Sequence, residues 1–313
     1  MIGYRGFRTA AVVAGTVGGL SGAAYGLLSE QAKRARTVIG RPEHPPLNAD
    51  GVYLPDRTGP HPFGTGPDPV RFGVIGDSSA AGLGVDLPSQ LPGTLLAAGL
   101  AEEAGRAVLL TTYAISGSTT RDLPDQVDRA LADPPTVALV IIGANDVTDR
   151  LSVRDSARLL GVQLARLRDA GVHVVVGTCP DLGAIRPIPQ PLRAVARGWS
   201  LLLARAQRVA VEKAGCVPVS LAALLSPEFF ARPDDLFSPD RFHPNAAGYE
   251  AAASVLLAPV CMAAGVWTPE RAARSQHEQA ERVTRAAIAA EAAEAGGALP
   301  ATLPVPGRTF ATG

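Results

Sequence analysis

Short apolar runs alternate with longer helical patterns through the middle of the chain. The apolar runs span 71–76, 108–114, 137–143, 172–178 and 217–221. Amphipathic or Leu/Ala-rich stretches lie between them, near 91–104, 123–132, 153–170 and 191–214. Nearly continuous apolar strands separated by helices are typical of a parallel sheet covered on both faces. We therefore predict an α/β fold, a three-layer α/β/α sandwich with a five-stranded parallel sheet.

The N-terminal pattern is different, because an uncharged run over residues 9–28 follows Arg5 and Arg8. Its length matches that of a helix that spans a bilayer, although several glycines dilute its apolar character. A membrane anchor and a cleaved secretory signal are both open interpretations, with a weak small-residue cleavage site at 22–24, and a buried soluble helix is a third. We favour an exported protein, either anchored in the cell envelope with its main domain outside the membrane or secreted after cleavage.

The segments on either side of the strand and helix alternation differ from it in composition. Pro and Gly crowd residues 40–69, which predicts an irregular linker. The segment from Thr268 to Ala293 is rich in Ala, Glu and Arg, and is followed by a Gly- and Pro-containing tail. The predicted divisions are an anchor or signal segment at 1–36, a linker at 37–70, a main domain at 71–267, and a charged helix with a disordered tail at 268–313.

Composition narrows the function classes. The chain carries 29 Lys and Arg against 29 Asp and Glu, so no overall field would attract nucleic acid. It has no metal-binding motif, no phosphate-binding glycine loop and no basic stripe interleaved with aromatics. We therefore expect no cofactor, no metal and no nucleic-acid partner. Cys179, Cys216 and Cys261 allow at most one internal disulfide, and we interpret them as small buried apolar residues.

Four short polar motifs lie at the ends of predicted strands. The stretch 76–79 ends the first strand, 116–118 follows the second and 143–146 follows the third. The stretch 240–243 follows the fifth strand, in a loop just before a helical pattern. Because ligands bind at the carboxyl ends of parallel strands, we expect these four motifs to meet at one edge of the sheet.

Together the motifs contain the groups that acyl transfer requires. A hydroxyl nucleophile needs a base that takes its proton, an acid that orients the base, and hydrogen-bond donors that face the oxyanion. Ser78 could be the nucleophile, and His243 and Asp240, three residues apart in one turn, could be the base and the acid. Gly117 and Asn145 could be the donors. Alternatively, Asp240 caps a helix or an Asx turn, and His243 is an exposed loop residue.

With these motifs in this order, residues 71–267 resemble the SGNH/GDSL hydrolase family of esterases and lipases. The resemblance implies the flavodoxin-like SGNH hydrolase fold and a nucleophile at Ser78. It also implies an oxyanion hole formed by Ser78, Gly117 and Asn145, with Asp240 and His243 completing the triad. The chain departs from the family pattern after the nucleophile, where Ser79 and Ala80 replace the more usual Leu-Thr or Ile-Thr.

The favoured function is that of a serine esterase that hydrolyses carboxylic esters with short to medium acyl chains. The loops 179–199 and 226–242 should supply an apolar rim, which suits an acyl chain. Alternatives are a deacetylase or acyltransferase that acts on cell-envelope glycans, and a membrane-tethered binding module without catalysis. The expected partner is a small-molecule, lipid or glycan ester, with possible membrane association through residues 9–28; the oligomeric state is left open.

Overall fold

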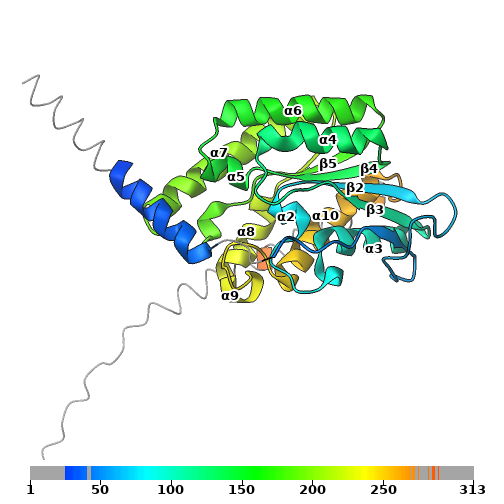
Figure 1. Cartoon of the computed structure of the whole chain (residues 1–313), viewed down its shortest axis with the longest axis horizontal. Coiled ribbons are helices and arrows are strands. Elements are labelled where there is room, and N and C mark those ends of the chain that lie inside the picture. The colour runs from blue at the N-terminus through cyan, green and yellow to red at the C-terminus, as the bar shows by residue number, and fades with distance from the viewer. Residues whose placement is uncertain are drawn as a thin grey trace, which may run out of the picture.

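One mixed sheet lies at the centre of the computed structural model, which describes residues 25–40, 44–268, 270–271, 274, 281, 284–285 and 288 (Figure 1). Within these residues the sheet has six strands in the order β1-β3-β2-β4-β5-β6. Their bounds are β1 Gly51–Tyr53, β2 Val70–Gly76, β3 Val108–Thr112, β4 Val137–Ile141, β5 His173–Gly177 and β6 Val217–Val219. The strands β2 to β6 are parallel, whereas β1 pairs antiparallel with β3.

Helices cover both faces of the sheet (Figure 1). On one face lie α4 Leu123–Ala132, α6 Val153–Asp169 and α7 Leu192–Lys213; on the other lie α3 Pro92–Ala104 and α10 Ala246–Ala263. The shorter elements are α2 Ser78–Ala81, α5 Ala144–Thr148, α8 Leu221–Ala231, α9 Pro233–Leu236 and the 3₁₀ turns η1 Pro88–Gln90, η2 Thr120–Asp122 and η3 Leu182–Ala184. The structure thus has the three layers that the sequence predicts.

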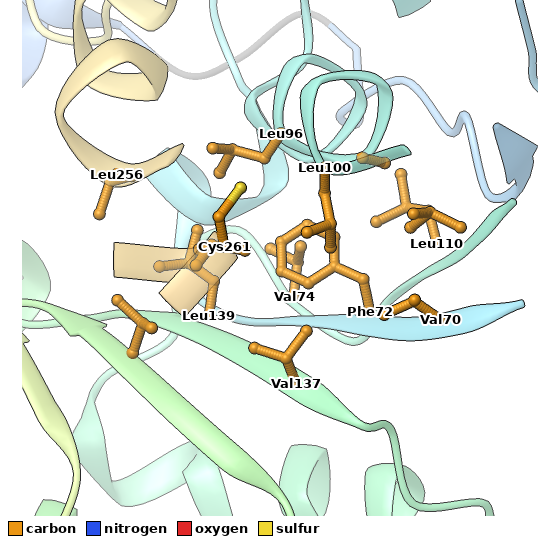
Figure 2. Close-up of a cluster of buried hydrophobic side chains, with 14 of the residues drawn as sticks. Val70, Phe72, Val74, Leu96, Leu100, Leu110, Val137, Leu139, Leu256 and Cys261 are labelled. Atoms are coloured by element: carbon orange, nitrogen blue, oxygen red, sulfur yellow. The ribbon is translucent and has the colours of Figure 1, made fainter. Parts of the chain in front are cut away.

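The alternation of side chains along β4 divides the core in two. Val137 and Leu139 pack into the cluster under α3 and α10, whereas Ala138 and Val140 pack into the cluster under α4, α6 and α7. Because successive side chains of a strand point to opposite faces, a strand buried on both faces must be apolar throughout. Figure 2 shows the first cluster, in which Phe72 and the neighbouring strand residues face side chains from α3 and α10.

The prediction of five strands is wrong by one strand. The sixth, β1, lies within residues 37–70, which the sequence analysis treats as a linker. Its register pairs Gly51 with Leu110 and Tyr53 with Val108. A three-residue strand is too short to show periodicity, and the surrounding Pro and Gly residues hide it. Tyr53 explains why the strand forms there, because its ring is almost fully buried and its hydroxyl donates to the carbonyl of Ala49 at 2.7 Å.

The expected N-terminal apolar run lies largely outside the described residues. Its last four residues begin a helix over 25–39, which we call the N-terminal helix. Among the described residues, one helix, α10, is long and apolar enough to span a membrane. Nearly half of its residues are buried inside the fold, and Leu256 and Cys261 belong to the sheet core. Most of the expected C-terminal helix is also outside the described residues, although residues 270, 271, 274 and 281 are helical and exposed.

Candidate active site

The turn from β2 into α2 carries Ser78 at the carboxyl edge of the sheet. Asp77 caps α2, and its Oδ1 accepts a hydrogen bond from the backbone N–H of Ser79 at 2.9 Å. Gly76 has φ +144°, and a side chain at this position would collide with the carbonyl of Ile141. Glycine is therefore required where the strand ends. The turn places Ser78 as the first residue of the short helix, with 6% of its surface exposed.

The loop between α9 and α10 carries Asp240 and His243. One carboxylate oxygen of Asp240 lies 2.6 Å from His243 Nδ1. The other accepts hydrogen bonds from the hydroxyl of Ser238 at 2.7 Å and from the backbone N–H groups of Phe242 and His243 at 2.8 and 2.9 Å. Burial alone would raise the pKa of Asp240, but the hydrogen bonds from His243, Ser238 and Phe242 lower it well below its usual range. Asp240 is therefore ionised at neutral pH.

His243 connects Asp240 to Ser78. An ionised carboxylate can only accept hydrogen bonds, so His243 Nδ1 carries a hydrogen and donates it to Asp240. In the neutral ring the other nitrogen, Nε2, is then an acceptor. It lies 2.9 Å from Ser78 Oγ. The structure thus brings these three residues together in the order that removal of the serine proton requires.

Two other predicted residues, Gly117 and Asn145, lie at the ends of the strands beside β2. Asn145 is in the first turn of α5, and its Nδ2 donates to the carbonyl of Ser118 at 2.9 Å. Gly117 is exposed and has φ +85°. Within the described part of the chain, the backbone N–H groups of Ser78 and Gly117 donate no hydrogen bond to the protein. Both are therefore open to a ligand, and the Asn145 amide has a second hydrogen.

Two buried acids beside these residues hold the loops in place. Asp146 accepts hydrogen bonds from the backbone N–H of Thr120, at 2.8 Å, and from its hydroxyl, and so ties the loop after β4 to the loop after β3. Asp77 caps α2 and is also fully buried. Burial raises its pKa to about 6, against the opposing effect of its hydrogen bond from Ser79. Neither acid contacts Ser78 Oγ or His243 through a hydrogen bond in the described residues.

Gln126, which is not among the predicted site residues, positions the same loops. Its Oε1 accepts from the backbone N–H of Gly76 at 2.8 Å, and its Nε2 donates to the carbonyl of Gly76 at 2.9 Å and to Ser118 Oγ at 3.0 Å. Gln126 is completely buried. The signal that could have found it is a glutamine in the apolar stripe of α4, between Leu123 and Val127.

An apolar cavity of about 100 Å³ adjoins the site. Its wall includes Ser79 and Ala144, which directly follow or precede candidate site residues in the sequence. The predicted rim loops supply Leu182, Ile185 and Phe229 to it, together with Phe237 and Phe242. Phe230 also belongs to the predicted rim loop 226–242, but it packs under the Arg197 guanidinium, whose Cζ lies 5.1 Å from the centroid of the Phe230 ring. The cavity is thus suited to a small apolar group.

Metal-binding and disulfide chemistry have no counterpart in the described part of the chain. No group of three or more His, Cys, Asp or Glu side chains there is arranged to hold a metal ion. Cys179, Cys216 and Cys261 are all buried free thiols. Burial raises the pKa of each thiol, to about 12 in the case of Cys261. The thiols are therefore poor nucleophiles.

Similarity to known proteins shows that the chain is an ester hydrolase. The model of the GDSL-like lipase/acylhydrolase family matches residues 74–251, and the chain belongs to this family. It is 44% identical over 262 residues to a GDSL-like esterase of Mycobacterium tuberculosis, a match that covers 80% of this chain and 82% of the relative.

Solved structures of the same fold include a lipase from a goat rumen metagenome and a lipase/acylhydrolase from Enterococcus faecalis. The first has 17% identity and a TM-score of 0.50, and the match covers 61% of this chain and 97% of the lipase. The second has 19% identity and a TM-score of 0.50, with 64% and 97% covered. These two matches support the fold. The prediction of an ester hydrolase of this family is confirmed by the family model and the mycobacterial relative.

Proposed function

We propose that this ester hydrolase is a serine esterase that works through an acyl-enzyme on Ser78. One observation carries the proposal: the continuous contact from Ser78 Oγ to His243 Nε2 at 2.9 Å and from His243 Nδ1 to Asp240 at 2.6 Å. A serine hydroxyl is a weak nucleophile until a base takes its proton. The ionised state of Asp240 favours the imidazolium that forms when His243 takes that proton.

In the first half of the reaction, Ser78 Oγ attacks the ester carbonyl carbon while its proton moves to His243 Nε2. The resulting oxyanion accepts hydrogen bonds from the backbone N–H groups of Ser78 and Gly117 and from the side-chain amide of Asn145. The intermediate collapses when the C–O bond to the alcohol breaks, and His243 gives its proton to the departing alkoxide. In the second half, water loses a proton to His243 and attacks the carbonyl carbon of the acyl-enzyme. The bond from this carbon to Ser78 Oγ then breaks, His243 returns its proton to Ser78 Oγ, and the carboxylic acid is released.

The proposed substrates are esters with short to medium acyl chains. The apolar cavity beside Ser79 and Ala144 has room for about 100 Å³, which suits a small acyl group. Its lining by aromatic and aliphatic side chains favours an acyl group without charge. We also propose that residues 71–267 form the catalytic domain and that the uncharged run over 9–28 directs the chain to the cell envelope.

The test is hydrolysis of p-nitrophenyl esters, from acetyl to palmitoyl, by the full chain and by S78A. S79A is the matched control, because this neighbouring serine holds α2 through its backbone rather than through its hydroxyl. We expect S78A to lose activity by several orders of magnitude and to lose labelling by a fluorophosphonate probe, whereas S79A keeps both. Equal rates for the full chain and S78A would refute the proposal.

A further inference from the structure

A second apolar cavity lies on the other side of Phe242, between the N-terminal helix and the domain. Its volume is about 280 Å³. One face of the N-terminal helix forms one wall, through Leu28, Ala32, Ala35 and Ile39. These positions recur every three or four residues, so they lie along a single stripe of the helix. The opposite wall comes from α5, the turn η3 and the first half of α7, and includes Val147, Ala196 and Trp199. We call this cavity the helix groove.

Hydrogen bonds and one buried side chain hold the N-terminal helix against the domain. Gln31 donates to the carbonyl of Gln190 at 2.6 Å and accepts from the backbone N–H of Leu192 at 3.0 Å. Arg36 donates to the carbonyl of Thr148 at 3.3 Å. Ala35 is buried in the same apolar cluster as Phe242. Packed protein interiors leave few voids larger than a water molecule, so a groove of this size beside a docked helix is room for a ligand.

The helix groove reaches the catalytic loop through Phe242. The ring of Phe242 lines both the groove and the smaller cavity beside Ser79. It also packs edge-on against the His243 ring, with the centroids 4.8 Å apart. His243 protonates the departing alcohol in the proposed reaction, so the alcohol part of the ester lies on the side of His243. Through Phe242, the groove therefore adjoins the His243 side of the site, where the alcohol part lies.

We propose that the helix groove binds the hydrocarbon part of an apolar alcohol, so that the substrate is a lipid ester with a small acyl group. This inference rests on the proposed function. The smaller cavity takes the acyl group, and the larger groove takes the chain on the other side of the scissile bond. The sequence supports a lipid source, because the N-terminal helix directly continues the uncharged run over 9–28. Leu28, the last residue of that run, is part of the groove lining.

The experiment compares acetate esters of alcohols of increasing length, from ethyl to octyl, with p-nitrophenyl esters of increasing acyl length. The full chain is reconstituted in phosphatidylcholine liposomes for every variant, and acid release is measured. A32W fills the groove from the helix, and A196F fills it from α7. V38W is the matched control, because Val38 lies on the same helix, is 63% exposed and does not line the groove.

For the wild type we expect kcat/KM to rise with alkyl length, by about fourfold for each methylene that enters the groove. A32W and A196F should lower the ratio of octyl to ethyl acetate by about tenfold or more, equivalent to two displaced methylenes. Both variants should still be labelled at Ser78 by a small fluorophosphonate probe, which shows that the nucleophile and its base are intact. V38W should keep the wild-type ratio.

Several results would overturn the inference. One is a wild-type kcat/KM that does not depend on alkyl length, and another is an unchanged ratio in both groove variants. A loss confined to the acyl series would assign the groove to the acyl chain instead. A changed oligomeric state with an unchanged ratio would assign it to a second copy of the chain. Failure of the proposed function would differ from all of these, because S78A would then match the wild type on p-nitrophenyl acetate.

Discussion

Replacing Asn145 with alanine separates catalysis from folding at this site. The Asn145 amide nitrogen carries two hydrogens, of which the carbonyl of Ser118 accepts one at 2.9 Å. In the proposed mechanism the other hydrogen meets the oxyanion, which exists only after Ser78 has attacked. N145A therefore removes one bond that is present in the resting protein and one that forms only in the transition state.

The two lost hydrogen bonds differ in the free energy that each contributes. An exposed or half-buried bond such as that to Ser118 contributes about 1 kcal/mol to folding. Loss of one oxyanion donor lowers kcat by about 10²- to 10³-fold, or about 3 to 4 kcal/mol of transition-state stabilisation. Because the substrate carbonyl in the ground state gains little from this donor, KM should change by no more than about twofold. We expect N145A to fold with nearly the wild-type melting temperature.

The assay is steady-state hydrolysis of p-nitrophenyl butyrate, together with thermal unfolding of each variant. T120V is the control for loop disorder, because it removes the hydroxyl hydrogen bond to Asp146 but leaves every proposed oxyanion donor. Asp146 is buried, so T120V should lose about 1 to 3 kcal/mol of stability and retain most of its kcat. A kcat for N145A within about threefold of wild type would remove Asn145 from the oxyanion hole. An equal loss of kcat in T120V would attribute the effect to the loops.

Three further changes test the surrounding framework. D240N should lower kcat by about three to four orders of magnitude with little effect on KM, measured with the same ester, and a wild-type rate would exclude Asp240 as the orienting acid. D77N keeps an oxygen for the N–H of Ser79 but removes a buried acid whose pKa is raised to about 6. Because the folded protein binds the Asp77 proton more tightly than the unfolded chain does, the wild type loses stability as the pH rises from about 4 to 6. D77N should therefore be more stable than the wild type by up to about 3 kcal/mol at pH 8, but not at pH 3.5. Equal melting curves for the two proteins at pH 8 would contradict this. Q126L leaves the backbone N–H of Gly76 unpaired, whereas the Gly76 carbonyl keeps its hydrogen bond from the Ile115 N–H at 3.1 Å. It should lower the free energy of unfolding by about 1 to 3 kcal/mol in urea titrations, and an unchanged midpoint would show that water replaces the amide.

The sequence predicts the parallel strands because each one is buried on both faces. The apolar runs 71–76 and 137–143 coincide with β2 and β4 within two residues, since their side chains face helices on either side. β1 escapes prediction because three residues do not establish a period and its pairing depends on a distant strand. The docking of the N-terminal helix cannot be predicted from the sequence for a similar reason. Its apolar stripe is legible in the sequence, but the surface that it covers is formed by segments more than a hundred residues away.

The candidate site residues are easier to predict from the sequence than the buried residues that hold their loops in place. Ser78 and Asn145 each lie within four residues of the end of a strand, so their position at the carboxyl edge follows from the order of the elements. The loop of His243 follows β6 only after α8 and α9, so its position does not follow from the strand order alone. That Asp240 lies within reach of His243 follows from their spacing. Which buried polar groups hold these loops together does not follow, because it depends on contacts between helices and strand ends. A glutamine in an apolar stripe indicates that its side chain has a buried hydrogen-bond partner, but the sequence does not identify that partner.

Two buried glutamines explain how the site stays in register with the sheet. The backbone groups of parallel strands lose their ladder partners where the strands end, and buried groups must find others. Gln126 of α4 pairs with both backbone groups of Gly76 at the end of β2. Gln207 of α7 donates to the carbonyl of Ile142 at 2.9 Å and accepts from the backbone N–H of Cys179 at 2.7 Å. The strand ends that lead to Ser78 and Asn145 are therefore fixed by helices of the core.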